Sequence, residues 1–109
     1  MANLQATQFE NTFPSTSNIV LNNTQDAKNI LSDVQGFLNQ HNLNVNVLYP
    51  NNTVLLSGKG TQHSTMIVTV VGSKIFTNVY YPEGDHEDFT HDLNWRNLRR
   101  VLSTFIRNA

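Results

Sequence analysis

Ten consecutive residues near the end of the chain concentrate side chains that ligate metals and transfer protons. Residues 83–92 read Glu-Gly-Asp-His-Glu-Asp-Phe-Thr-His-Asp, with two imidazoles and five carboxylates. Both groups are ligands for zinc, manganese or iron. The best set is His86, Asp88 and His91, with His63 joining from the predicted sheet. The spacing matches neither His-Glu-x-x-His nor a calcium-binding loop. A metal-dependent enzyme that uses these residues is therefore an alternative hypothesis. Our main expectation is a protein without a cofactor.

The acids of this segment also have a simpler interpretation. They precede the last predicted helix, and a helix N-terminus carries a partial positive charge that favours nearby acids by about 0.3–1 kcal/mol each. This interpretation is favoured over the metal site.

Arginines follow the acids. Residues 93–109 contain four arginines and no acid, so nine of the fifteen charges lie in the last 27 residues, sorted by sign. In a helix, Arg96, Arg100 and Arg107 fall opposite the apolar stripe, with Arg99 to the side. Guanidinium groups pair with carboxylates and phosphates. We predict a partner-binding surface made of Arg96, Arg99, Arg100, Arg107, Asp85, Glu87 and Asp88. Nucleic acid is a further alternative, although four arginines are few and no stacking aromatics are interleaved with them.

Nucleophilic catalysis has little support. The chain has no cysteine and no Gly-x-Ser-x-Gly motif. Ser64 directly follows His63, and neighbours in a strand point to opposite faces, so the two cannot act as a pair. We expect no catalytic residues, which favours a protein that is not an enzyme.

The elements that must position these residues follow from hydrophobic periodicity. Apolar residues at spacings of three and four predict an amphipathic helix over 24–41, capped by Asn23 or Thr24. Residues 43–49 and 53–57 predict one hairpin, turning at 50–52. Residues 64–71 and 75–81 predict a second, with Gly72-Ser73 as a type II′ turn. The nearly continuous apolar run 64–71 indicates a central strand.

The last helix is predicted to begin at Asn94, as N-cap. Phe89 and Leu93 would project away from its apolar face if the helix began earlier, so 83–92 is assigned to a loop or a separate helical turn. Leu93 then packs on Leu98 as a hydrophobic staple.

Residues 1–17 lack periodicity, which predicts a flexible or loosely docked arm. The arm is expected to be loose unless Phe9 and Phe13 dock. Residues 19–21 suggest an edge strand. Residues 18–109 form one predicted α+β domain: an antiparallel sheet of about four strands, in two hairpins, flanked by an N-terminal and a C-terminal helix packed on one face.

Composition narrows the classes of function. The chain has 109 residues and a net charge of −1, which favours neither nucleic acid nor acidic membranes. Without cysteine, disulfide scaffolds and thiolate-bound metals are excluded. No apolar run is long enough to cross a bilayer and the start resembles no secretion signal, so we expect a cytoplasmic protein, with virion or extracellular association left open.

By elimination, the leading hypothesis is a small non-catalytic interaction domain that engages a protein partner or itself, of the kind found among phage or mobile-element accessory proteins and inhibitors. An antiparallel sheet with an edge strand can pair with a second copy or with a partner strand.

Overall fold

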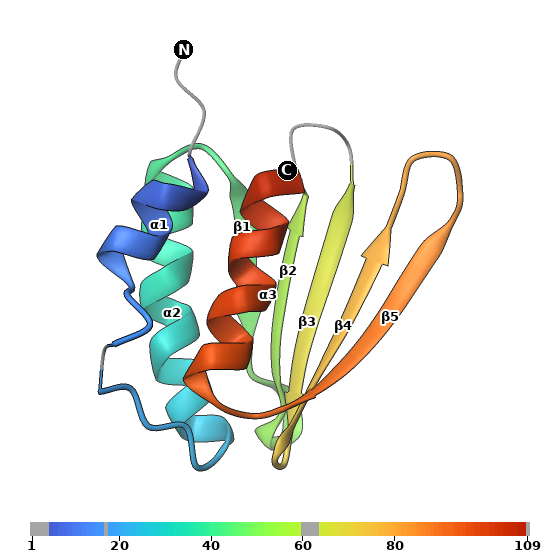
Figure 1. Ribbon diagram of the computed structural model, residues 1–109. Helices are drawn as coiled ribbons and strands as arrows, with labels where there is room; N and C mark the ends of the chain where they lie inside the picture. The colour runs from blue at the N-terminus through green and yellow to red at the C-terminus, as the bar shows by residue number, and fades with distance from the viewer. Residues whose placement is uncertain (1–4, 17, 60–63, 109) are drawn as a thin grey trace.

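A computed structural model describes residues 5–16, 18–59 and 64–108, and within these ranges helices and strands form two layers (Figure 1). The elements are α1 (Ala6–Thr12), α2 (Thr24–Gln40), β1 (Asn44–Leu48), the 3-10 turn η1 (Pro50–Asn52), β2 (Val54–Lys59), β3 (Thr65–Val71), β4 (Lys74–Tyr80), β5 (His86–Asp92) and α3 (Trp95–Asn108). The strands form one sheet in the order β1-β2-β3-β4-β5, with each neighbouring pair antiparallel. The helices lie on one face of it. The predicted α+β architecture is confirmed, with five strands instead of about four.

The helix predicted over 24–41 is α2. The Asn23 side chain caps it by accepting from the backbone N–H of Asp26 at 2.9 Å. One face is buried against the sheet through Ala27, Leu31, Val34 and Leu38. The local signal was sufficient here because apolar spacing and cap agree.

Both predicted hairpins are present. η1 joins β1 to β2, and the turn Gly72-Ser73 joins β3 to β4. The φ angle is positive at Gly72 (+57°) and not at Ser73, which agrees with the predicted type II′ turn. β3 is the middle strand of the sheet, as its apolar run indicated.

Of the segment 83–92, predicted to be a loop or a helical turn, residues 83–85 do belong to the connection after β4. His86–Asp92 instead form strand β5, so the prediction was wrong for these residues. β5 pairs with β4 along its whole length, from His86 opposite Tyr80 to Asp92 opposite Lys74. Alternate residues of a strand share a face of the sheet. The side chain of Phe89 follows this two-residue period, which explains why it did not fit the apolar face of the last helix. The predicted start of α3 is confirmed: the Asn94 side chain accepts from the N–H of Asn97 at 2.8 Å.

Helix α1 docks against the rest of the fold. Phe9 of α1 is fully buried, and its ring centroid lies 5.3 Å from that of Phe13. Phe13 is half-buried and packs against the core, with its ring centroid 5.6 Å from that of Phe37. Residues 19–21 form no strand, contrary to the suggestion from the sequence. Leu21 packs into the core while Val20 is exposed, so the segment anchors the chain to the helical layer without joining the sheet.

α3 packs closely against β2 at Gly58. A Cβ added at Gly58 would lie 2.9 Å from Cζ of Phe105 and 3.1 Å from Cγ2 of Val45, so only glycine fits there without a shift. Within the described part of the chain, no helix combines the length and the apolar character needed to cross a membrane.

Candidate functional site at the β5 edge

The two edges of the sheet are treated differently. At the β1 edge, the backbone N–H of Val45 donates to Oδ1 of Asn39 at 3.1 Å, and the N–H of Val47 donates to Oε1 of Gln35 at 3.0 Å. Both amide side chains come from α2. An edge strand presents unpaired backbone groups that can pair with another chain. Here side-chain oxygens of α2 accept the hydrogen bonds of these two outward N–H groups.

Within residues 5–16, 18–59 and 64–108, the β5 edge has no such cover. The N–H of Leu93 donates to the carbonyl of Ser73, and the N–H of Tyr81 donates to the carbonyl of Asp85, at 2.8 and 2.9 Å. Opposed residues in an antiparallel pair alternate between hydrogen-bonded and non-hydrogen-bonded positions. The odd-numbered residues of β5 therefore bond to β4. The residues that direct their backbone groups away from the sheet are His86, Asp88, Thr90 and Asp92.

One contact agrees with this assignment. The carbonyl oxygen of Asp92 accepts from the side-chain amide of Asn97, which lies outside the sheet, at 2.9 Å. Across the described residues, the outward backbone groups of His86, Asp88 and Thr90 meet no protein partner. β5 is thus the edge at which a further strand can add.

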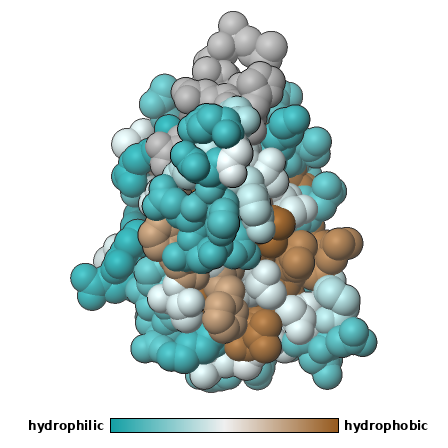
Figure 2. All heavy atoms as spheres, turned by 90° about the vertical axis from the view of Figure 1, so that its right-hand side faces the viewer, coloured by the Kyte–Doolittle hydropathy of each residue, from teal (hydrophilic) through white to brown (hydrophobic). Residues whose placement is uncertain are grey.

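A groove lies beside this edge on the helical face. α2 and α3 cover the β1 side of the sheet, and β4 and β5 extend beyond them (Figure 1). The space left between α3 and β5 measures about 230 Å³ and is lined by Met66, Thr77, Val79, Phe89, His91, Arg100, Val101 and Thr104. Phe89 remains 44% exposed. Figure 2, which views the molecule from the β5 side, shows hydrophobic side chains reaching the surface among hydrophilic ones.

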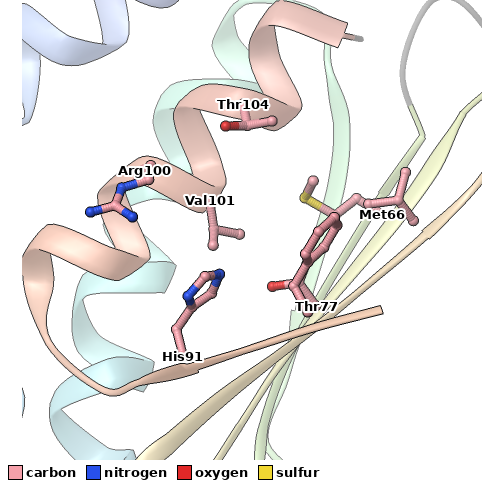
Figure 3. Close-up of a pocket in the computed structure, with 8 residues that line it drawn as sticks. Met66, Thr77, His91, Arg100, Val101 and Thr104 are labelled. Atoms are coloured by element: carbon pink, nitrogen blue, oxygen red, sulfur yellow. The ribbon is translucent and has the colours of Figure 1, made fainter. Parts of the chain in front are cut away.

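Thr77 forms part of the groove floor. The residue is 2% exposed, and its Oγ1 is buried without a hydrogen-bond partner among the described residues. Figure 3 shows the hydroxyl directed into the groove, towards the His91 ring. Leaving a buried hydroxyl unpaired costs about 1–3 kcal/mol.

Two of the predicted acidic residues hydrogen-bond to side chains of β4 or of the residue that follows it. Glu87 accepts from the Tyr81 hydroxyl at 2.8 Å, and this hydrogen bond raises the pKa of Tyr81 above its usual 10.0. Asp88 accepts from the amide of Asn78 at 2.6 Å. Asp85 is exposed in the turn that precedes β5.

At the other end of β5, Asp92 accepts from the ammonium group of Lys74, and this hydrogen bond lowers the pKa of Asp92 below its usual 3.8.

The candidate metal ligands are divided by the sheet. His86 and Asp88 share its open face, with Nε2 and Oδ2 3.5 Å apart. His91 points to the helical face, into the groove. His63 lies outside the described residues. In the described ranges, no three His, Cys, Asp or Glu side chains gather into a group able to hold a metal ion.

The predicted arginines divide into two pairs. Arg99 donates from Nε to the carbonyl of Phe13 at 2.8 Å, and Arg107 pairs with Glu10 at 3.1 Å, so both hold α1 against α3. Arg96 and Arg100 are exposed and, within the part of the chain described, make no salt bridge or hydrogen bond. Arg100 borders the groove.

Sequence reasoning missed Met66, Thr77, Val79 and Val101 because the groove appears only when β5 joins the sheet. The available signal was Phe89, a large apolar residue within a run of charges. No family model, no curated protein and no solved structure matches this chain.

Proposed function

We propose that this chain is a non-catalytic interaction domain that binds a polypeptide strand along β5. The observation that carries the proposal is the asymmetry of the sheet. Asn39 and Gln35 occupy outward donors of β1, whereas the outward backbone groups of His86, Asp88 and Thr90 in β5 have no protein partner in the described chain and lie next to the exposed ring of Phe89.

Strand addition explains how such an edge binds. Backbone hydrogen bonds supply affinity, and pockets for alternate side chains supply specificity. A strand added to β5 would turn every second side chain towards the helical face, beside Phe89 and the groove. Arg100 at the groove border favours an acidic or hydrogen-bond-accepting group there.

The alternatives receive less support. A metal-dependent enzyme needs His86, Asp88 and His91 on one side of the sheet, but His91 lies on the other side. A nucleic-acid binder needs a free basic face, but Arg99 and Arg107 are engaged by α1.

The test is Thr90→Pro. The N–H of Thr90 points away from β4, so proline removes an outward donor without removing a bond of the sheet, a position that edge strands tolerate. Thr90→Ser keeps both the N–H and the hydroxyl and is the matched control. Thermal unfolding of both variants verifies that the fold is retained.

Tagged wild-type and variant proteins are incubated with lysate of the source cells, and amide hydrogen exchange is measured on the complexes recovered. We expect slower exchange of the outward amides of β5 in the wild-type and Thr90→Ser complexes, and loss of the bound chain with Thr90→Pro. Equal recovery with Thr90→Pro, or protection confined to α3, would overturn the proposal.

A further inference from the structure

We infer that the strand added to β5 is β5 of a second copy, running antiparallel about a two-fold axis at Phe89. This inference rests on the proposed function and names its partner.

The free edge limits the registers. Outward groups belong to the even-numbered residues of β5, so pairing between copies must set even residues opposite even residues. A two-fold axis then sets one residue of β5 opposite the same residue of the second copy, and this residue marks the position of the axis. The central candidates are Asp88, Phe89 and Thr90.

Only the axis at Phe89 gives complementary neighbours throughout. Each carboxylate of one β5 then lies opposite an imidazole or a hydroxyl of the other, and Phe89 lies opposite the second copy's Phe89. The opposed pairs are His86 with Asp92, Glu87 with His91, and Asp88 with Thr90. An imidazole N–H can donate to a carboxylate in either charge state of the ring, and a threonine hydroxyl can donate as well.

The neighbouring registers place acid against acid. An axis at Asp88 sets Asp88 opposite itself. An axis at Thr90 sets Asp88 opposite Asp92, and symmetry repeats this pair. Like charges directly opposed across strands are destabilising. Charged edge strands are normally a device against association. The charges of β5 therefore disfavour self-pairing about Asp88 or Thr90 and favour self-pairing about Phe89.

The geometry at the axis favours the same register. As an odd-numbered residue, Phe89 would form a non-hydrogen-bonded pair with the second copy's Phe89, where side chains come closest. This contact buries the ring that is 44% exposed in the single chain. A two-fold axis perpendicular to the sheet keeps both helical layers on one face. The two grooves would then meet, and each would gain the second copy's Phe89 as a wall.

The test uses charge exchange at the Glu87–His91 pair. In His91→Glu homodimers, the register opposes acid to acid twice; in Glu87→Lys homodimers it opposes lysine to imidazole twice. In a mixed dimer, formed in an equimolar mixture of the two variants, the introduced glutamate lies opposite the introduced lysine, and the unchanged Glu87 lies opposite the unchanged His91. Both positions are therefore complementary. Molecular mass is measured by sedimentation equilibrium over an about hundredfold range of concentration.

We expect the wild type to form dimers, each single variant to dissociate about tenfold more readily, and the mixture to recover wild-type affinity. Glu83→Lys makes the same charge change as Glu87→Lys in the turn outside β5 and should leave dimerisation unchanged. Failure of the mixture to recover, or an equal effect of Glu83→Lys, would overturn the register.

The outcomes separate this inference from the proposed function. A monomeric wild type that still captures another protein in a Thr90→Pro-sensitive manner overturns the second copy and supports strand addition. A dimer that neither Thr90→Pro nor the charge exchanges affect uses another surface, which overturns the inference and removes the support for strand addition.

Discussion

The guanidinium group of Arg99, on α3, reaches the end of α1 and donates from Nε to the carbonyl oxygen of Phe13 at 2.8 Å. Its Nη2 also lies 3.4 Å from the carbonyl of Glu10. The last carbonyls of a helix have no partner within the helix, and cations are favoured there. Arg99 therefore acts as part of the scaffold that keeps the first helix docked.

Replacing Arg99 with alanine should lower the free energy of unfolding by about 1.5–3 kcal/mol, because charged hydrogen bonds to part-buried carbonyls are lost. The indole N–H of Trp95, the single tryptophan, donates to the carbonyl of Pro14 at 3.0 Å, so its fluorescence reports on the same docking. We expect a red shift in Arg99→Ala. Arg96→Ala, on the exposed side of α3, should change stability by less than about 0.5 kcal/mol. Equal effects would contradict this role for Arg99.

Local signals were sufficient where the spacing of apolar residues agreed with the ends of an element. The helix from Thr24 to Gln40 has apolar residues on one face and Asn23 as cap, and Asn94 begins α3 as expected. The turn at Gly72 follows from the ease with which glycine adopts a positive φ.

β5 could not be predicted in the same way. Its sequence is rich in Asp, Glu and His, and acids are depleted in strands. What makes it a strand is the hydrogen bonding to β4 and its position at the edge, where charged side chains meet water on both sides. The groove could not be predicted from the sequence either, because it also depends on contacts between elements that are distant in the chain. Met66, Thr77 and Val101 lie on three elements and converge only through tertiary packing.

Gly58 and Gly36 should respond in opposite directions to substitution by alanine. At Gly58 the new methyl group would meet the Phe105 ring at 2.9 Å, so we expect a loss of about 1–3 kcal/mol from overpacking. Gly36 is exposed in α2, where no atom of the described residues lies within 4 Å of an added Cβ, and alanine there should stabilise by about 0.5–1 kcal/mol. Urea denaturation measures both. A neutral Gly58→Ala would mean that α3 moves away from β2 at little cost.

Asn39 should protect the β1 edge. Asn39→Ala removes the acceptor of the Val45 N–H, and we expect faster hydrogen exchange at that amide and a loss of about 1 kcal/mol. An uncovered edge also favours association between strands. Gln40→Ala, one residue further along α2, should leave the exchange of Val45 unchanged. Unaltered exchange in Asn39→Ala would show that the amide does not cover this edge.

The Lys74–Asp92 pair should make stability depend on pH in the acid range. Lys74 holds the pKa of Asp92 below its usual 3.8, so the folded state binds this proton less readily than the unfolded state. The contribution is therefore fully present above the unfolded pKa and is lost as pH falls through the lower folded pKa. NMR titration of Asp92 should give a midpoint below 3.8, which Lys74→Met raises and Lys28→Met leaves unchanged. A midpoint unaffected by Lys74→Met would contradict the pairing.

Thr77→Val should stabilise the protein. The substitution keeps the β-branched shape and removes a hydroxyl that is buried without a partner in the described chain. Because an unpaired buried hydroxyl costs about 1–3 kcal/mol, we expect the free energy of unfolding to rise by about 1 kcal/mol. Thr69→Val makes the same change on the open face, where the residue is half-buried, and should have an effect below about 0.5 kcal/mol. Thermal and urea denaturation of both variants provide the measurement. A destabilised Thr77→Val would mean that the hydroxyl finds a hydrogen-bond partner in solution, and the groove floor would then be polar and occupied instead of apolar.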